Sequence, residues 1–117
     1  MRYKKKENEA LDKCFESATK HGMNVRLSDE VIFYRKMFHW EYIKHEDIAK
    51  MYRRVEEVIS HTSCCAENMD IDKLIVTLKD GSVIEIHVCD GERRLAEKLY
   101  ADITSAWTDI AYGKEGA

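Results

Sequence analysis

The sharpest alternation of apolar and polar positions lies in residues 73–88, KLIVTLKDGSVIEIHV, where two β-branched runs flank the sequence KDG at residues 79–81. A three-residue loop separates the side chains by polarity, whereas a two-residue loop mixes apolar and charged groups on one face. The longer loop is a type I turn with a bulge, in which Gly81 takes the left-handed conformation. The pattern therefore predicts a β-hairpin with Val76 opposite Ile84. Its apolar face is Leu74, Val76, Leu78, Ile84, Ile86 and Val88, and its other face is Lys73, Ile75, Thr77, Val83, Glu85 and His87.

Helical spacing of apolar residues marks one element near each end of the chain. Residues 7–20 precede Gly22 and carry one apolar stripe, so they predict a surface helix that covers a sheet or an open barrel end. Residues 91–107 follow Asp90, a suitable capping residue, and predict a second helix that closes a sheet. We expect the tail after Ile110 to fray. The two stripes are Ala10, Leu11, Cys14, Phe15 and Ala18, and Leu95, Ala96, Leu99, Tyr100, Ile103, Ala106 and Trp107.

Short β-rich segments occupy the region between the first helix and residue 44. Residues 24–28, 31–36 and 39–44 are rich in β-branched and aromatic side chains, which favour a pleated surface. Met37 and Phe38 then lie at a hairpin tip, where exposed apolar side chains favour contact with a partner. We expect the two tryptophans, Trp40 and Trp107, to belong to the core.

Residues 46–60 allow two interpretations. Their apolar residues recur at helical spacing, and this period alone predicts an amphipathic helix. Strand alternation separates apolar from charged side chains less cleanly in this segment. The local pattern therefore leaves helix and strand open. The apolar residues concerned are Ile48, Met51, Tyr52, Val55, Val58 and Ile59.

Composition limits the classes of function. With 117 residues the chain has room for one domain, and its net charge of −3 builds no broad positive field for nucleic acid. The basic run at residues 2–6 is followed at once by Glu7 and Glu9, which is typical of a solvated terminus. No apolar run approaches the ~18 residues needed to insert into a membrane, and the N-terminus lacks a signal-peptide core. We therefore expect a cytoplasmic protein with reduced cysteines.

The sequence also resembles a known family. The segments RLSDEVIFY (residues 26–34) and IKHEDI (residues 43–48) resemble the opening strands of bacterial pleckstrin-homology-like, or GRAM-like, domains. The segment YRRVEEV (residues 52–58), the Cys64-Cys65 pair and the KDG hairpin look like a group of small proteins from Clostridia-type bacteria that has no established activity. The likeness covers about residues 23–112.

This resemblance implies an α+β fold with residues 47–58 as a long strand. It implies that residues 23–112 form an antiparallel, six- to seven-stranded, partly open barrel of pleckstrin-homology-like architecture with a C-terminal capping helix. The residue pattern itself places an N-terminal amphipathic helix in residues 1–22 and a frayed tail at 113–117. Relatives with this fold often bind phosphoinositide headgroups through a basic first hairpin loop. Here that loop is Ser28-Asp29-Glu30, whose acidity argues against phosphoinositide binding.

Candidate chemistry is sparse. The loop residues His61, Cys64 and Cys65 form the one group with metal character, with His87 and Cys89 elsewhere. Zinc prefers four ligands with paired cysteines two to four residues apart, and adjacent cysteines point in different directions. We therefore expect no metal or cofactor, and no catalytic motif predicts an enzyme. We expect a non-catalytic module that binds an unknown protein partner or forms a homo-oligomer, and the alternative is a thiol- or metal-dependent regulator using His61, Cys64 and Cys65.

Overall fold

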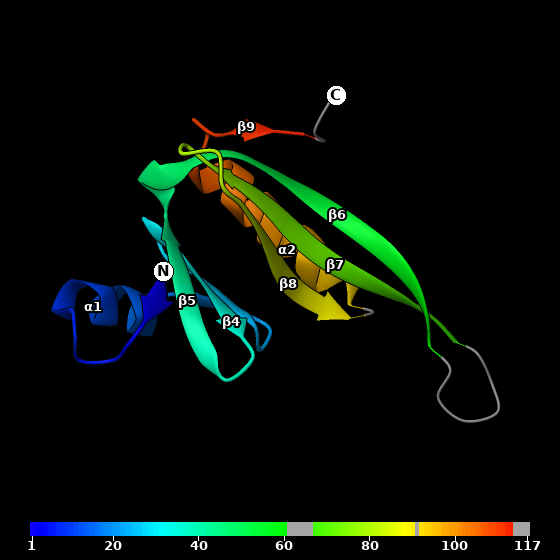
Figure 1. Cartoon of the computed structure of the whole chain (residues 1–117), viewed down its shortest axis with the longest axis horizontal. Helices are drawn as coiled ribbons and strands as arrows, with labels where there is room; N and C mark the ends of the chain where they lie inside the picture. Colours follow the sequence, from blue (N-terminus) through cyan, green and yellow to red (C-terminus); the bar gives the residue numbers. More distant parts are fainter. Residues whose placement is uncertain (61–66, 91, 114–117) are drawn as a thin grey trace.

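The structure is a computed structural model that describes residues 1–60, 67–90 and 92–113. The described chain is α+β and folds into two α-helices and two sheets, which do not close into a barrel (Figure 1). No helix in these ranges is long and apolar enough to cross a bilayer. The elements are β1 (Arg2–Tyr3), α1 (Glu9–Ser17), β2 (Thr19–His21), β3 (Val25–Leu27), β4 (Val31–Lys36), β5 (His39–Lys44), the 3-10 helix η1 (His45–Asp47), β6 (Ile48–Ser60), β7 (Glu67–Leu78), β8 (Val83–Asp90), α2 (Arg93–Ala106) and β9 (Ala111–Tyr112).

The first sheet has the strand order β1-β5-β4-β3-β2, and the second has the order β8-β7-β6-β9. Neighbouring strands are antiparallel except β6 and β9, which pair in parallel. The prediction of six to seven strands is therefore too low for the described chain, which has nine. The additional strands are short: β1, β2 and β9 have only two or three residues each.

The β7–β8 hairpin confirms the predicted register. Val76 pairs with Ile84, Leu74 pairs with Ile86, and Gly81 has a φ of +95°. Ile75, an apolar member of the other face, is only 4% exposed. Its neighbours on the adjacent strands, Tyr52 and Glu85, flank it in the middle of the sheet.

Residues 48–60 form the long strand β6 and not a helix. Its backbone pairs with β7 from Ile48 to Ser60, with one irregularity between Ile48 and Lys50. The pairing with a neighbouring strand therefore overrides a helical period that is only a local signal. Figure 1 shows β6 and β7 continuing together beyond the rest of the second sheet.

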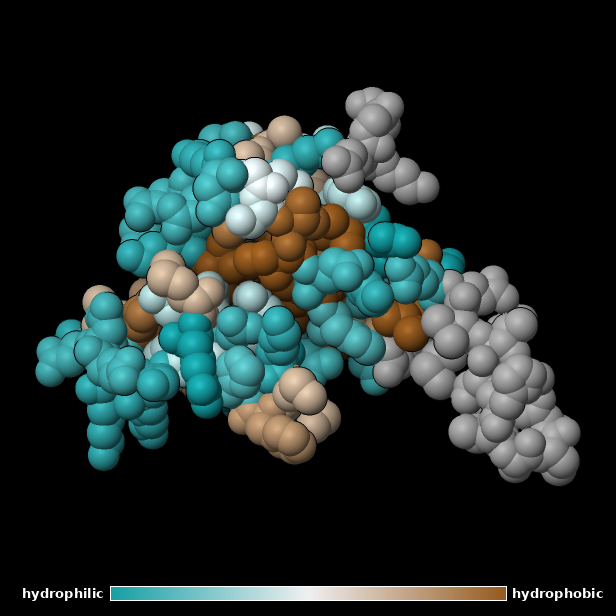
Figure 2. Space-filling model, viewed as in Figure 1, coloured by the Kyte–Doolittle hydropathy of each residue, from teal (hydrophilic) through white to brown (hydrophobic). Residues whose placement is uncertain are grey.

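The main core lies between the two sheets and α2. This helix packs along β7 and β8 with Ala96, Leu99 and Ile103 buried, followed by Trp107 at its end. Figure 2 shows hydrophobic side chains gathered in the middle of one face of the molecule, where Figure 1 draws β7 and β8. The other buried members come from both sheets and include Val25, Ile32, Ile43, Met51, Leu74, Val76, Ile86 and Val88.

A smaller cluster occupies the opposite face of the first sheet, under α1. Phe15 of α1 stacks on Tyr3 with ring centroids 4.7 Å apart and meets Phe33 and Trp40 edge-on. The expectation that this helix covers a sheet is thus confirmed, and both tryptophans pack in apolar clusters.

Three boundaries differ from those expected. The first helix ends at Ser17 instead of residue 20, because residues 19–21 pair with β3. Asp90 is the last residue of β8, and Glu92 precedes α2 without a side-chain capping bond. Residues 111 and 112 are paired with β6 and do not fray, while 114–117 lie outside the described residues.

Candidate functional site

The tip of the β4–β5 hairpin carries two large apolar side chains. Lys36 pairs with His39, so Met37 and Phe38 alone form the loop. Met37 is 80% exposed and Phe38 is 94% exposed. Hydrophobic atoms project at this tip in the space-filling view (Figure 2). Adjacent apolar groups that share one exposed tip are typical of contact sites.

Met37 also has a backbone conformation that favours glycine. Its φ is +56°, in the left-handed region that a β-carbon disfavours by about 1 kcal/mol. Two-residue hairpin loops with a positive φ at the first loop residue usually have glycine or asparagine there. Local turn chemistry therefore does not explain methionine at this position, and strained residues are concentrated at functional sites.

A groove of about 350 Å³ begins at this tip and separates β4 from β8. Arg35 contributes to the lining, although strand alternation places its side chain on the same face of the first sheet as Val31 and Phe33. Lys36 pairs with Glu41 at 3.8 Å. The lining therefore carries both signs of charge, from Lys36 on β4 and Glu85 on β8. Its lining residues are Asn24, Tyr34, Arg35, Lys36, Met37, Glu85 and His87.

Tyr34 supplies a hydrogen-bond donor to this groove. The residue is 5% exposed, and within the described chain its hydroxyl has no hydrogen-bond partner. Burial, followed by the nearby carboxylate of Glu41, raises the pKa of Tyr34 to about 12. The hydroxyl therefore keeps its proton at neutral pH and is available to donate to a bound acceptor.

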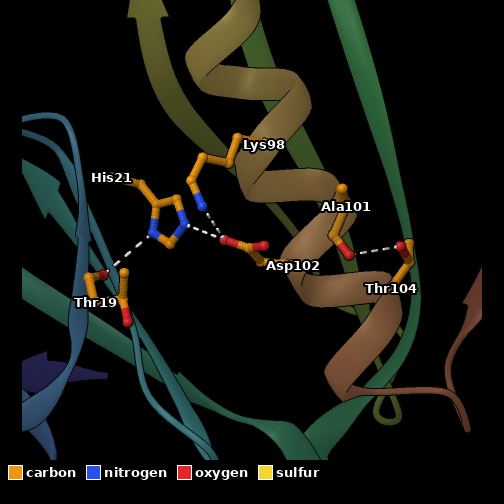
Figure 3. Close-up of polar contacts among 6 residues, drawn as sticks. All are labelled: Thr19, His21, Lys98, Ala101, Asp102 and Thr104. Atoms are coloured by element: carbon orange, nitrogen blue, oxygen red, sulfur yellow. Dashed lines mark hydrogen bonds and ion pairs between the residues drawn. The ribbon is translucent and has the colours of Figure 1, made fainter.

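A second polar cluster joins β2 to α2 (Figure 3). The buried ring of His21 contacts the Thr19 carbonyl through Nδ1 at 3.2 Å and the Asp102 carboxylate through Nε2 at 2.9 Å. Lys98 approaches the same carboxylate at 3.3 Å. The His21 hydrogen bond lowers the pKa of Asp102. Because both ring nitrogens are occupied inside the protein, this cluster holds α2 to the first sheet and does not present a free base.

A buried ion pair lies on the inner face of the second sheet. Arg53 donates from Nε and Nη2 to Oδ1 of the fully buried Asp72 at 3.0 and 2.7 Å, and Asp72 Oδ2 has no hydrogen-bond partner. Asp72 faces Cys89, whose thiol donates to the Glu92 carbonyl at 3.2 Å. Burial and then the Asp72 charge raise the pKa of Cys89. This thiol therefore stays protonated and is a poor nucleophile.

A second cavity of about 340 Å³ lies between α1 and the ends of β4 and β5, and it contains both Cys14 and His45. His45 is bonded to Asp109 at 2.6 Å and stacks on Trp107. No hydrogen bond joins the Cys14 thiol to His45 in the described structure, so the pair lacks the contact expected of a nucleophile and its base.

The sequence-predicted site residues have different outcomes. Met37 and Phe38 lie together at an exposed tip, as expected. His61, Cys64 and Cys65 lie outside the described residues. Across the ranges that are described, no three His, Cys, Asp or Glu side chains come close enough together to hold a metal ion.

Sequence reasoning missed the groove and the His21–Asp102 pair. Both join residues more than 45 positions apart, on elements whose relative placement no local pattern reports.

Comparisons of this chain with protein-family models, curated proteins and solved structures find no significant match. Its function therefore has to be inferred from its own geometry.

Proposed function

We propose that this chain is a non-catalytic protein-interaction domain of pleckstrin-homology-like architecture whose contact surface is centred on the β4–β5 tip. The observation that carries the proposal is the pair Met37 and Phe38, both more than three-quarters exposed and one of them strained. A contact that buries both side chains would recover apolar area at roughly 25 cal/mol per Å².

The architecture supports the same proposal. Two sheets built almost entirely of antiparallel strands, with a C-terminal helix packed on the second, are the features of the fold on which this part of the proposal rests. The loop between β3 and β4 contains Asp29 and Glu30, and the Asp29 carbonyl accepts a hydrogen bond from the Trp107 indole at 2.8 Å. An acidic loop tied to the core supports a protein partner over a phosphoinositide headgroup.

The test compares two exposed methionine sites. A Met37→Ser/Phe38→Ser variant and a Met23→Ser control, which also changes a methionine that is 80% exposed, are used beside the wild type in quantitative affinity capture from cells. We expect partners that bind the wild type and the control to be lost from the tip variant by at least about tenfold, since hot-spot side chains carry most of the binding energy. Equal recovery with all three proteins would overturn the proposal.

Self-association is one form that this contact can take. Sedimentation of the wild type and the tip variant over a wide concentration range will distinguish a contact between two copies of this chain from a contact with a different protein. A dimer lost only in the tip variant identifies a second copy as the partner, and a monomer at every concentration assigns the tip to a different protein.

The regulatory alternative, centred on His61, Cys64 and Cys65, has its own test: stoichiometric zinc in the purified protein would favour it over the proposal.

A further inference from the structure

Strand β6 has a long free edge. Strand β9 pairs with only Lys50 and Met51, so in the described chain no strand lies beside β6 from Tyr52 onward. Strand β8 ends opposite Ile71, and beyond that point β6 and β7 continue as a two-stranded ribbon (Figure 1). Such a ribbon is only marginally stable in water, and unpaired backbone groups at an edge offer a template for another strand. A further strand along β6 would therefore stabilise this part of the sheet.

The hydrogen-bond pattern fixes which backbone groups of β6 point outward. Leu78 N–H donates to the Ser82 carbonyl at 2.8 Å, so the even-numbered residues of β7 in this hairpin turn their backbone groups toward β8. The odd-numbered residues bond to β6, where Lys73 lies opposite Arg54. Bonded positions alternate along β6 in the same way. Val55 and the other odd-numbered residues of β6 therefore point their N–H and C=O groups toward the open edge.

The sequence of this edge is complementary to itself. Residues 52–58 read YRRVEEV, so the charge changes sign at Val55, with two arginines before it and two glutamates after it. Two such strands that pair in antiparallel fashion about a two-fold axis through Val55 place Arg54 opposite Glu56 of the second copy. Residue 53 then lies opposite residue 57, which again sets an arginine against a glutamate. Opposite charges at facing positions stabilise a strand pair, and like charges destabilise it.

Neighbouring registers lack this complementarity. The outward groups of one strand must meet the outward groups of the other, which requires the two-fold axis to pass through a residue. An axis through any charged residue in the range 53–57 places that residue against its own copy. Val55 is the one uncharged residue in this range, and its side chain is 40% exposed. The charge pattern therefore selects a second copy of the chain, in a single register.

The surroundings of β6 fit this register. Glu56 contacts Lys73 at 3.1 Å and Arg54 of its own strand at 3.0 Å, so pairing exchanges the second contact for an equivalent one between copies. Symmetric pairing about Val55 runs from residue 52 to residue 58, and β9 occupies the edge up to Met51. The added strand therefore stops where β9 begins. Seven residues at roughly 3.3 Å each give a paired length of about 23 Å.

We propose that two copies of this chain pair through their β6 edges, antiparallel and centred on Val55, so that the two second sheets join into one continuous sheet. Backbone hydrogen bonds between the outward groups supply affinity. The contact between Arg54 and Glu56 of the second copy lies at a position without direct backbone bonds, where facing side chains are closest, and it sets the register. This edge is separate from the β4–β5 tip, so the inference goes beyond the proposed function and does not depend on it.

Charge reversal tests the register, by sedimentation of the full chain at concentrations up to about 1 mM. Arg54→Glu and Glu56→Arg each place like charges opposite each other in the symmetric pair. We expect each to raise the dimer dissociation constant at least about tenfold. The double variant Arg54→Glu/Glu56→Arg restores opposite charges and should dimerise as the wild type does. An equimolar mixture of the two single variants should form a mixed dimer, because each supplies the charge that the other lacks.

Glu85→Arg is the matched control. It makes the same change of charge as Glu56→Arg on the same face of the sheet, but on β8 at the opposite edge. We expect it to leave the dimer unchanged. Hydrogen exchange tests the backbone pairing directly. Protection of the Val55 amide should rise at least about tenfold as the protein dimerises, whereas the Arg54 amide, which already bonds to β7, should change much less.

The outcomes separate this inference from the proposed function. A monomer at every concentration, a dimer that either single reversal leaves intact, or a double variant that stays monomeric would overturn pairing through β6. A dimer lost only in the Met37→Ser/Phe38→Ser variant would also overturn it, because self-association would then belong to the tip. If the dimer depends on Arg54 and Glu56 while capture of partners does not depend on the tip, the β6 pairing stands and the proposed function fails.

Discussion

At the scale of single residues, the two tight hairpins use different amino acids for the same backbone requirement. Gly81 has a φ of +95° with open space where a β-carbon would lie, and glycine removes the strain there. Met37 has a φ of +56° and keeps its side chain. The contrast separates a glycine that relieves backbone strain from a methionine that keeps an exposed side chain despite it.

Met37→Gly should therefore stabilise the free protein and weaken its contact with a partner. Relief of the left-handed strain, set against the entropy that glycine adds to the unfolded chain, leaves an expected gain of about 0.5 kcal/mol in the free energy of unfolding. Urea denaturation measures the change.

Met23→Gly is the matched control, because Met23 is equally exposed but has no positive φ. There the entropy cost is not offset, and we expect a loss of up to about 1 kcal/mol. A loss of similar size at both positions would show that Met37 is not strained.

Arg53 and Asp72 provide the second residue-scale prediction. Asp72 is fully buried and one of its oxygens is already unpaired, so Arg53→Met should leave an uncompensated charge and cost about 3–5 kcal/mol. Adding Asp72→Asn should recover part of that loss, since the remaining group is neutral. Denaturation of the four proteins in a double-mutant cycle measures the coupling, and additive losses would argue against a stabilising pair.

At the scale of elements, local patterns were reliable where one face of the element is buried. The 73–88 hairpin gathers most of its apolar side chains on one face, and its register follows from the loop length that preserves this segregation. Strands β4 and β5 begin and end as predicted, because their β-branched and aromatic runs stop at a short loop. Residues 48–60 have a misleading helical period of apolar residues because the charged residue Arg53 lies on the inner face of the strand. There its guanidinium pairs with the Asp72 carboxylate.

Only part of the proposed contact surface can be predicted from sequence, for the same reason. Apolar residues between two strands mark an exposed tip, so Met37 and Phe38 could be identified from sequence. The groove joins residues 34–37 to residues 85–87, and its existence depends on how the two sheets are placed relative to each other. No periodicity within one element reports that placement.

The contact between β2 and α2 predicts a pH dependence. The hydrogen bond from His21 holds the pKa of Asp102 below its ordinary value of 3.8. A carboxyl group with a lowered folded-state pKa contributes stability at pH values above 3.8, and that contribution is lost as the pH falls through the lower, folded-state pKa. Asp102→Asn should therefore flatten the acid side of the stability profile and leave a less stable protein at neutral pH.

Thermal unfolding between pH 2.5 and 7 tests this expectation. Lys98→Met is the control, because it removes only an exposed partner of the same carboxylate and should have little effect. If Asp102→Asn and wild type show parallel profiles, the His21–Asp102 hydrogen bond does not stabilise the docking of α2.

At the scale of the whole molecule, the chain ends protect the sheets on which the proposed contact surface lies. Strand β1 covers the β5 edge and β9 covers part of the β6 edge. Tyr112 of β9 also hydrogen-bonds through its hydroxyl to the Ile103 and Trp107 carbonyls and packs edge-on against Tyr100. The terminal strand therefore ties the end of α2 to the second sheet.

Truncation after Ile110 should lower stability and extend the free edge of the second sheet. Losing the Tyr112 contacts should cost about 1–3 kcal/mol. Unpairing Lys50 and Met51 extends the part of the β6 edge that β9 does not cover, which enlarges a template for strand pairing. Thermal unfolding and sedimentation measure the two effects, and truncation after Gly113 is the control because it keeps β9. If both truncated proteins keep the wild-type oligomeric state and melting temperature, the β9 pairing contributes nothing measurable to stability and does not limit strand pairing at the β6 edge.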